Sequence, residues 1–365
     1  MAATQRLRIA SLAVRAVAAP MRRPLATSTG ALTVAPLVLL DLRTDAGIVG
    51  RSYLFALGKQ NLKPIAALAE AMGGMLEGDA VAPFEIERKL RARYTLLGVH
   101  NIVLFAMAGI DMCAWDALGQ ALGAPVARLL GGALQPVPAY NSKGLGIMPL
   151  KPLIKEAVEL VEEGFPAVKL RLGRPDAKAD LEALRAVKKA IGPETALMVD
   201  FNQALTVAEA LRRGRMIDDE GGVVWIEEPV RADDFAGCAT LAREIKTPIQ
   251  IGENFMGPEQ MAQAIAAGAC DYVMPDAQRI GGVTGWMRAA ALAQGAGLEM
   301  SSHLFPEASC QLLAVTPTRH WLEYVDWADP VLQEPVRIEK GCAVGPSGNG
   351  FGMKWNEKAV KRFAA

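Results

Sequence analysis

The chain has 365 residues, which is long enough for two or three domains with a substantial hydrophobic core. Its 39 basic residues balance 39 acidic ones, so the protein has no net positive charge that would attract a polyanion. Nucleic-acid binding is therefore disfavoured as its main function. The five cysteines are odd in number and form no Cys-x-x-Cys pair, which argues against a disulfide framework or a zinc knuckle. Apolar runs such as Ala35 to Leu40 fall far short of the ~20 residues that span a bilayer. We therefore expect a soluble, cytoplasmic protein with no membrane partner.

The residues before Asp41 include five arginines and no acid, which superficially resembles a mitochondrial transit peptide. These arginines are Arg6, Arg8, Arg15, Arg22 and Arg23. We favour the alternative of a first strand, because apolar residues from Leu7 to Val17 recur on a near-alternating pattern that is broken once, as at a bulge.

The first 60 residues predict a small antiparallel sheet with strands at 7–17, 36–44 and 47–57, the last two joined by a turn at Asp45-Ala46-Gly47. From about 61 to 131 the pattern is helical, and the segment 102–122 is apolar on most sides, which predicts a buried helix. Residues 1–131 are therefore expected to form an α+β domain.

From about residue 137 to 325 a strand and a helix alternate, which is typical of βα units around a parallel sheet. The predicted strands, eight in number as a closed barrel requires, are 137–142, 167–172, 196–202, 223–228, 249–254, 272–277, 298–304 and 321–325. An open Rossmann sheet is the alternative, but no Gly-x-Gly-x-x-Gly follows an early strand. We expect an α/β (β/α)8-type TIM barrel over residues 132–325, and a segment 326–365 that packs back on the N-terminal domain.

Three consecutive strands of this barrel end in carboxylates. Asp200, Glu227 and Glu253 are separated by 27 and 26 residues, about one βα unit each, so the strands deliver three acids to one rim. Converging carboxylates repel one another, whereas a divalent cation satisfies all three. Hard oxygen ligands without His or Cys favour Mg2+ over zinc.

The next two strands end in a second pair of groups, Asp276 and His303, again 27 residues apart. A carboxylate bonded to one imidazole nitrogen fixes the tautomer and raises the basicity of the other nitrogen. The pair predicts a general base or acid at His303.

Cations and a further acid complete the predicted site. Lys169 and Arg171 lie two apart on the second strand and share a face, so both require anions inside the barrel. Glu323 on the eighth strand is expected to have a raised pKa, close to other acids and a substrate carboxylate, and to donate a hydrogen bond.

These residues, together with longer motifs, resemble the enolase superfamily and specifically its mandelate racemase subgroup, within the mandelate racemase and muconate lactonizing enzyme family. The resemblance covers nearly the whole chain. The motifs that carry it are 35–39 APLVL, 52–56 SYLFA, 109–112 GIDM, 114–119 AWDALG, 225–229 WIEEP, 252–254 GEN, 274–276 MPD, 280–286 IGGVTGW, 301–305 SSHLF and 321–323 WLE.

The resemblance implies an N-terminal capping domain over a modified (β/α)7β barrel, with Mg2+ held at the positions of Asp200, Glu227 and Glu253. It also implies a His303–Asp276 dyad, an electrophilic Glu323, and removal of the proton α to a carboxylate to give an enediolate. Mg2+, Lys169 and a protonated Glu323 would oppose the charge of that enediolate. A homo-oligomer is a further implication.

The sequence departs from the subgroup at Arg171, where similar enzymes carry the second lysine of Lys-x-Lys as a base on the face opposite the histidine. Arginine stays protonated at neutral pH and is a poor proton acceptor. We therefore expect a single base, His303, and dehydration of an acid sugar. The alternatives are a mandelate-type racemase or epimerase of a 2-hydroxy acid, and, more distantly, a non-catalytic binding protein on the same fold.

The substrate is expected to be a small carboxylate, with Lys169 and Glu323 at its carboxylate group and Asn202 and Ser142 as neighbours. In similar enzymes, loops of the capping domain set specificity, and the corresponding segments here are 20–33 and 51–60. Polar groups in the first segment are Arg22, Arg23, Thr27, Ser28 and Thr29, whereas Leu25, Leu32, Phe55 and Leu57 could form apolar walls.

Overall fold

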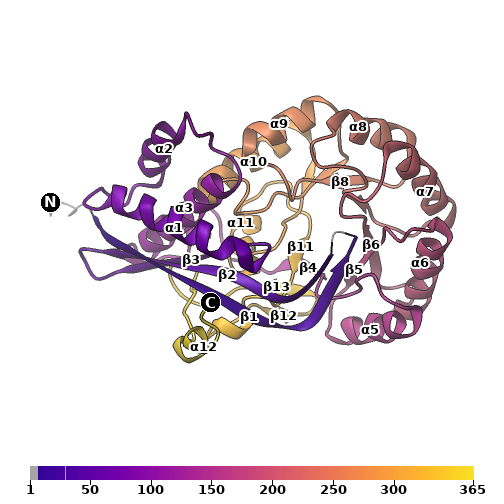
Figure 1. The fold of residues 1–365 in the computed structure, drawn as a ribbon, viewed down its shortest axis with the longest axis horizontal. Helices are drawn as coiled ribbons and strands as arrows, with labels where there is room; N and C mark the ends of the chain where they lie inside the picture. The colour runs from indigo at the N-terminus through magenta and orange to yellow at the C-terminus, as the bar shows by residue number, and fades with distance from the viewer. Residues whose placement is uncertain (1–6, 29) are drawn as a thin grey trace.

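The structure is a computed structural model that describes residues 7–28 and 30–365 of the chain, so Arg6 and Thr29 lie outside the described residues. A sheet with its helices forms the N-terminal domain, and a ring of helices around short parallel strands forms the barrel beside it (Figure 1). Both parts of the predicted architecture are present.

The N-terminal domain is built on three antiparallel strands, β1 (Ile9–Thr27), β2 (Gly30–Thr44) and β3 (Val49–Phe55). The middle strand is buried continuously from 35 to 42, because helices cover its sheet. The helical elements of this domain are η1 (Lys59–Asn61), α1 (Leu62–Leu76), α2 (Pro83–Tyr94), α3 (Ile102–Ala121) and α4 (Val126–Leu129).

Helix α3 is long and apolar enough to cross a membrane by length and composition, but 83% of its most apolar window is buried inside the fold. It packs against α1, β2 and β3 and also against a barrel helix, α10 (Gly282–Ala296). The helix therefore forms the core of the N-terminal domain, as its all-round apolar pattern predicts.

The hairpin of β1 and β2 is much longer than the sequence predicts. Residues 20–27 and 30–33, expected as a specificity loop, continue the two strands, with an irregularity in pairing between Pro20 and Leu25. The first half of the second expected loop, 51–60, is likewise part of strand β3. The hairpin reaches the barrel, where Ala26 accepts a hydrogen bond from the backbone of Ile147 and Ser28 Oγ donates to the carbonyl of Phe201.

The barrel contains all eight predicted strands as shorter elements. They are β4 (Val137–Asn141), β5 (Ala167–Arg171), β6 (Ala196–Asp200), β7 (Ile226–Glu227), β8 (Ile249–Ile251), β9 (Tyr272–Val273), β10 (Glu299–Met300) and β11 (Leu322–Tyr324). They pair in parallel from β4 to β10, and β11 pairs with β4. Backbone hydrogen bonds from Ser302 to Trp321 and from His320 to Met300 join the remaining edge.

Helices follow the strands around the outside of the barrel (Figure 1). Besides α10, they are α5 (Leu150–Glu162), α6 (Ala177–Ile191), α7 (Val207–Glu220), α8 (Phe235–Glu244), α9 (Pro258–Ala266) and α11 (Pro306–Ala314). Because the barrel strands pair in parallel, their carboxyl ends open on one rim.

The last 40 residues contact both parts of the molecule. They contain η2 (Asp329–Val331), β12 (Arg337–Glu339), β13 (Cys342–Val344) and α12 (Glu357–Arg362). Strand β13 pairs antiparallel with β4 of the barrel, while Phe363 accepts a hydrogen bond from Ala18 of β1 and Trp355 Nε1 donates to Asp41 of β2.

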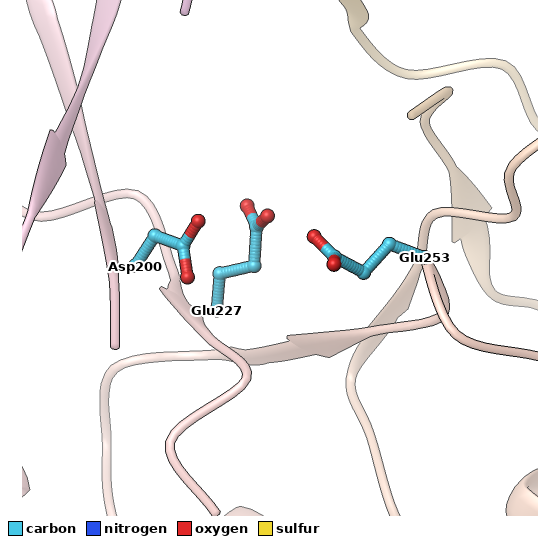
Figure 2. A group of neighbouring side chains, drawn as sticks. All are labelled: Asp200, Glu227 and Glu253. Carbon is cyan, nitrogen blue, oxygen red and sulfur yellow. The ribbon is translucent and has the colours of Figure 1, made fainter. Parts of the chain in front are cut away.

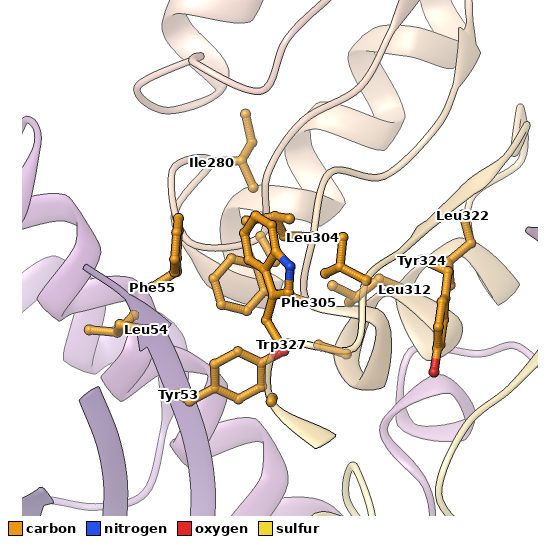
Figure 3. Packing of buried hydrophobic residues seen from close by; sticks show 14 of the residues in the cluster. Tyr53, Leu54, Phe55, Ile280, Leu304, Phe305, Leu312, Leu322, Tyr324 and Trp327 are labelled. Atoms are coloured by element: carbon orange, nitrogen blue, oxygen red, sulfur yellow. The ribbon is translucent and has the colours of Figure 1, made fainter. Parts of the chain in front are cut away.

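An aromatic cluster joins the N-terminal domain to the barrel (Figure 3). Tyr53 packs on Phe305 at a ring distance of 5.0 Å, and Phe55 packs on Trp327 at 4.9 Å. The Tyr53 hydroxyl also donates to the buried Glu307 of α11 at 2.6 Å. Burial raises the pKa of Glu307 to about 7, although the Tyr53 hydrogen bond opposes the shift.

Glu307→Gln is therefore expected to make the protein more stable above pH 7. A carboxyl whose folded pKa is raised costs stability as the pH rises from its unfolded value of ~4.3 to about 7, whereas a neutral amide avoids this cost and still accepts from Tyr53. Denaturant unfolding at pH 5 and pH 8 should show a gain on the order of 2 kcal/mol confined to pH 8. The exposed Glu70→Gln serves as control; an equal gain at both pH values would contradict the interpretation.

Candidate active site

Three carboxylates from neighbouring strands meet at the rim, as predicted. Asp200 ends β6, Glu227 ends β7, and Glu253 lies two residues beyond β8. One oxygen from each lies within 4.8 Å of the others (Figure 2). Asp200 and Glu227 are fully buried, and Glu253 is partly exposed.

The donor set fits a hard divalent cation, because it offers carboxylate oxygens converging on one point. Burial raises the pKa of Glu227 to about 8, and the charges of Asp200 and Glu253 contribute to the rise although Lys169 opposes it. Lys169 Nζ lies 2.6 Å from Glu227 and 3.3 Å from Asp200. One ammonium among several acids leaves the site in need of further positive charge, which Mg2+ would provide.

His303 and Asp276 form the predicted pair. The backbone after β10 places His303 Nδ1 2.7 Å from Asp276 Oδ2, and Asp276 Oδ1 accepts backbone hydrogen bonds from Gln278 and Arg279. The other ring nitrogen, Nε2, lies 3.4 Å from Glu253. Asp276 therefore fixes the ring, and Nε2 faces the carboxylate cluster.

The environment of His303 makes its imidazole strongly basic. Burial alone would lower the pKa of His303, but the charges of Glu253 and Glu323, and the contact with Asp276, outweigh burial and raise it to about 9. A cation bound to Glu253 would offset part of this carboxylate's charge and so lower the pKa of His303. More of the imidazole would then be neutral, which is the form that accepts a proton.

Glu323 does not have the raised pKa that is expected for an acid beside other acids. Burial would raise it, but Lys169 Nζ at 2.7 Å and the charge of His303 hold the pKa of Glu323 well below its usual range. Its oxygens also accept hydrogen bonds from Ser142 Oγ at 2.7 Å and from the backbone of Leu304 at 3.0 Å. The expectation is wrong for this state because cations and donors, rather than other acids, lie nearest to Glu323.

Arg171 lies beside the site but turns toward the loop after β4. Its Nη1 donates to the carbonyls of Ser142 and Gly144 at 3.0 and 2.6 Å, and its Nη2 donates to Ser142 Oγ at 2.6 Å. The side chain is buried. A permanently protonated group engaged as a donor in this way has no capacity to accept a proton.

Asn202 contacts the carboxylate of Asp200 and lines the cavity beside the cation site. Its backbone and side-chain nitrogens donate to the two oxygens of Asp200 at 2.7 and 3.1 Å, whereas its own Oδ1 is buried and has no hydrogen-bond partner. Asn202 has a φ of 44°, a conformation that non-glycine residues rarely adopt. Strained residues of this kind are typical of functional sites.

The three expected specificity residues of the hairpin differ in their surroundings. Arg23 pairs with Glu159 and Glu163 at the end of α5, at 2.8 and 3.4 Å, so its charge is already engaged there. Leu25 is buried in the hydrophobic core. Arg22 remains three-quarters exposed, with its Nε 3.9 Å from Asp326. The structure therefore does not bring Arg23 and Leu25 together with the carboxylate cluster as free substrate contacts.

Sequence reasoning missed a second layer of residues around the cation site. Asn254 Nδ2 donates to Glu253 and, at 2.6 Å, to the buried Glu228, and Arg279 donates to Asn254 Oδ1. Gln203 also donates to Glu228. The available signal was their position, because each of them follows a predicted site residue by one to three places.

A cavity of ≈ 450 Å³ opens between the two domains beside this layer. Glu253, Asn202 and Arg279 line it from the barrel, and Leu57 and Phe105 line it from the N-terminal domain. A ligand of small-molecule size therefore has a route to the cation site that both domains shape.

The barrel, the three rim carboxylates and the His–Asp pair define a barrel enzyme that carries out metal-assisted proton transfer. Residues 9–131 match the mandelate racemase / muconate lactonizing enzyme N-terminal domain, and residues 152–359 match the enolase C-terminal domain-like family. The chain belongs to the mandelate racemase and muconate lactonizing enzyme family of the enolase superfamily. The predicted fold and family are confirmed.

The chain is 32% identical over 332 residues to the L-talarate/galactarate dehydratase of Salmonella typhimurium (strain LT2), covering 90% of this chain and 82% of that protein. It also superimposes on an enolase from alpha proteobacterium bal199 with bound magnesium (TM-score 0.96, 45% identity, 98% and 100% coverage). An enolase from Bradyrhizobium complexed with magnesium and mandelic acid gives a TM-score of 0.93 at 42% identity, with full coverage of both chains.

Proposed function

We propose that this enzyme dehydrates an acid sugar by removing the proton α to its carboxylate and then expelling the β-hydroxyl. One observation carries the proposal: His303 Nδ1 is held by Asp276 at 2.7 Å while Nε2 faces the cluster, and Arg171 is engaged as a donor to the loop after β4. The site therefore offers one base. Dehydration needs only one, and the similar Salmonella protein is a dehydratase.

Each residue has a separate task in this reaction. Lys169 holds the substrate carboxylate, Glu323 orients the Lys169 ammonium at 2.7 Å, and Mg2+ held by Asp200, Glu227 and Glu253 would supply positive charge against the enediolate. His303 accepts the C2 proton, and the protonated imidazole then returns it to the departing C3 hydroxyl as water leaves. The resulting enol becomes a 2-keto-3-deoxy acid. Lys169 stays protonated, because Glu227 and Glu323 outweigh burial and raise its pKa.

Proton NMR of the enzyme with Mg2+ in D2O tests the reaction directly. A panel of mono- and diacid sugars and both mandelate enantiomers should contain a compound that loses its α-proton signal and yields a 2-keto-3-deoxy product. The result that would overturn the proposal is racemisation of mandelate with no keto-deoxy product from any acid sugar.

A mandelate-type racemase is the second candidate, favoured by the mandelic acid bound in the Bradyrhizobium relative. Racemisation requires a second base, so this candidate needs Arg171 to accept a proton. Optical rotation of mandelate with the wild type and with Arg171→Lys separates the two: the dehydratase proposal expects no racemisation by the wild type. Robust racemisation that Arg171→Lys leaves intact or reduces would favour the racemase.

We also propose that the protein works as a cytoplasmic homo-oligomer on small carboxylates, with Arg22 as a hairpin residue that contacts the distal end of the substrate. The exposure of Arg22 supports this role, because three-quarters of its side chain is accessible to an incoming anion, although its Nε lies 3.9 Å from Asp326. Sedimentation of the purified protein tests the oligomer, and a monomer at micromolar concentration would exclude it.

A further inference from the structure

We infer that Arg171 is a positioning residue that acts through Ser142: it fixes the Ser142 hydroxyl as a donor to Glu323 and so shapes the end of the site that holds the substrate carboxylate. The inference rests on the proposed function only for the ligand used to test it. It gives a role to the residue at which the sequence departs from the Lys-x-Lys pattern.

The Ser142 hydroxyl makes one hydrogen bond with Arg171 and one with Glu323. A hydroxyl has one proton to donate and two lone pairs that accept. Arg171 Nη2 can only donate, and at 2.6 Å it occupies a lone pair of Ser142 Oγ. The single Ser142 proton is then directed to Glu323 Oε1 at 2.7 Å. Arg171 therefore donates to Ser142, and Ser142 in turn donates to Glu323.

The fork of the guanidinium carries the second step. Nη1 holds the backbone of the same loop through the carbonyls of Ser142 and Gly144, while Nη2 holds the Ser142 side chain. One residue thus fixes both the main chain and the hydroxyl of Ser142. A lysine ends in a single nitrogen and cannot reproduce this two-pronged contact.

The positive charge of Arg171 also interacts electrostatically with Glu323. Both side chains are buried, and the positive charge of Arg171 contributes to holding the pKa of Glu323 low. Glu323 Oε1 already accepts from Lys169 at 2.7 Å, so Ser142 and Lys169 orient the same oxygen. Removing Arg171 frees the Ser142 hydroxyl to rotate, which loosens Glu323 and the carboxylate pocket it shares with Lys169.

The test is calorimetry with Mg2+ and oxalate, a planar dianion that resembles the enediolate of a 2-hydroxy acid. Arg171→Met and Ser142→Ala should each weaken oxalate binding about 10-fold, the range for losing a hydrogen bond to a charged group. Because Arg171 acts on Glu323 through Ser142, the two losses of affinity should not add. The double variant should bind oxalate about as well as the single variant with the lower affinity. Binding of Mg2+ alone should stay within about threefold of the wild type.

Arg213→Met is the matched control. Arg213 is also buried in the barrel domain, where it bonds Asp180 and Glu209 on the outer helices. Both arginine variants should lower the melting temperature, but only Arg171→Met should weaken oxalate. If Arg171→Met fails to fold, Arg171→Lys replaces it in the comparison of single and double variants. The expected loss of oxalate affinity is the same.

Two results would overturn the role of Arg171. One is wild-type oxalate affinity in Arg171→Met, and the other is a double variant whose loss is the product of the two single losses, about 100-fold. A wild-type protein that fails to bind oxalate at millimolar Mg2+ overturns the enediolate site itself together with this role, so the two failures are distinguishable.

Discussion

Replacing His303 with asparagine is expected to abolish turnover while Mg2+ binding persists. Asparagine keeps a donor for Asp276 but has no nitrogen that accepts a proton, and a positioned general base contributes about 10²- to 10⁴-fold to rate. Because the proposed site contains one base, and the same imidazole serves both as base and as acid, we expect a loss of kcat of at least about 10³-fold. Product formation and α-proton exchange, followed by NMR, should fall together.

His100→Asn is the matched control, because His100 is exposed and lies outside the carboxylate cluster. It should turn over at the wild-type rate. Exchange of the α-proton that persists in His303→Asn would assign the base to another residue, and loss of Mg2+ binding in that variant would show that the substitution damages the cation site rather than the proton transfer.

Removing the divalent cation is expected to have an effect of similar size. Chelation should abolish turnover, and added Mg2+ should restore it, since the buried carboxylates cannot themselves oppose a second negative charge on the substrate.

Glu227→Gln should weaken Mg2+ binding at least about 10-fold, because it removes one of three converging charges. The cation also stabilises the fold, by about 2.7 kcal/mol at 100 times its Kd, so the melting temperature reports binding without any assay of activity.

The exposed Glu259→Gln on α9 serves as the control for this experiment. It should show the full rise in melting temperature with Mg2+, whereas Glu227→Gln should show about half of that rise or less at the same Mg2+ concentration. A wild-type protein that neither gains stability from millimolar Mg2+ nor loses turnover on chelation contradicts the assignment of the three carboxylates.

Most of the barrel could be predicted from sequence because its signals are local. Each strand is a short apolar run, and the functional side chain stands at its end, as in Ile226-Glu227 and Val199-Asp200. Spacing of one βα unit then places the ends together without knowledge of any contact.

The features that sequence reasoning missed depend on contacts between distant residues. Pro20, Pro24 and the arginines between them interrupt the apolar alternation of β1, so its continuation to Thr27 follows from pairing with β2. The low pKa of Glu323 depends on Lys169 being closer than the other acids. The direction of the Arg171 side chain likewise depends on carbonyls 27 and 29 residues away, for which no local pattern exists.

The most direct test of proton abstraction by a single base compares the two C2 epimers of the acid sugar that reacts. Proton NMR in D2O with Mg2+ follows the α-proton of each epimer at equal enzyme concentration. If His303 is the only base, one epimer loses its α-proton and the other keeps it for at least about 10³ times longer. Comparable loss from both epimers would show a second base on the opposite face and would contradict the single-base mechanism.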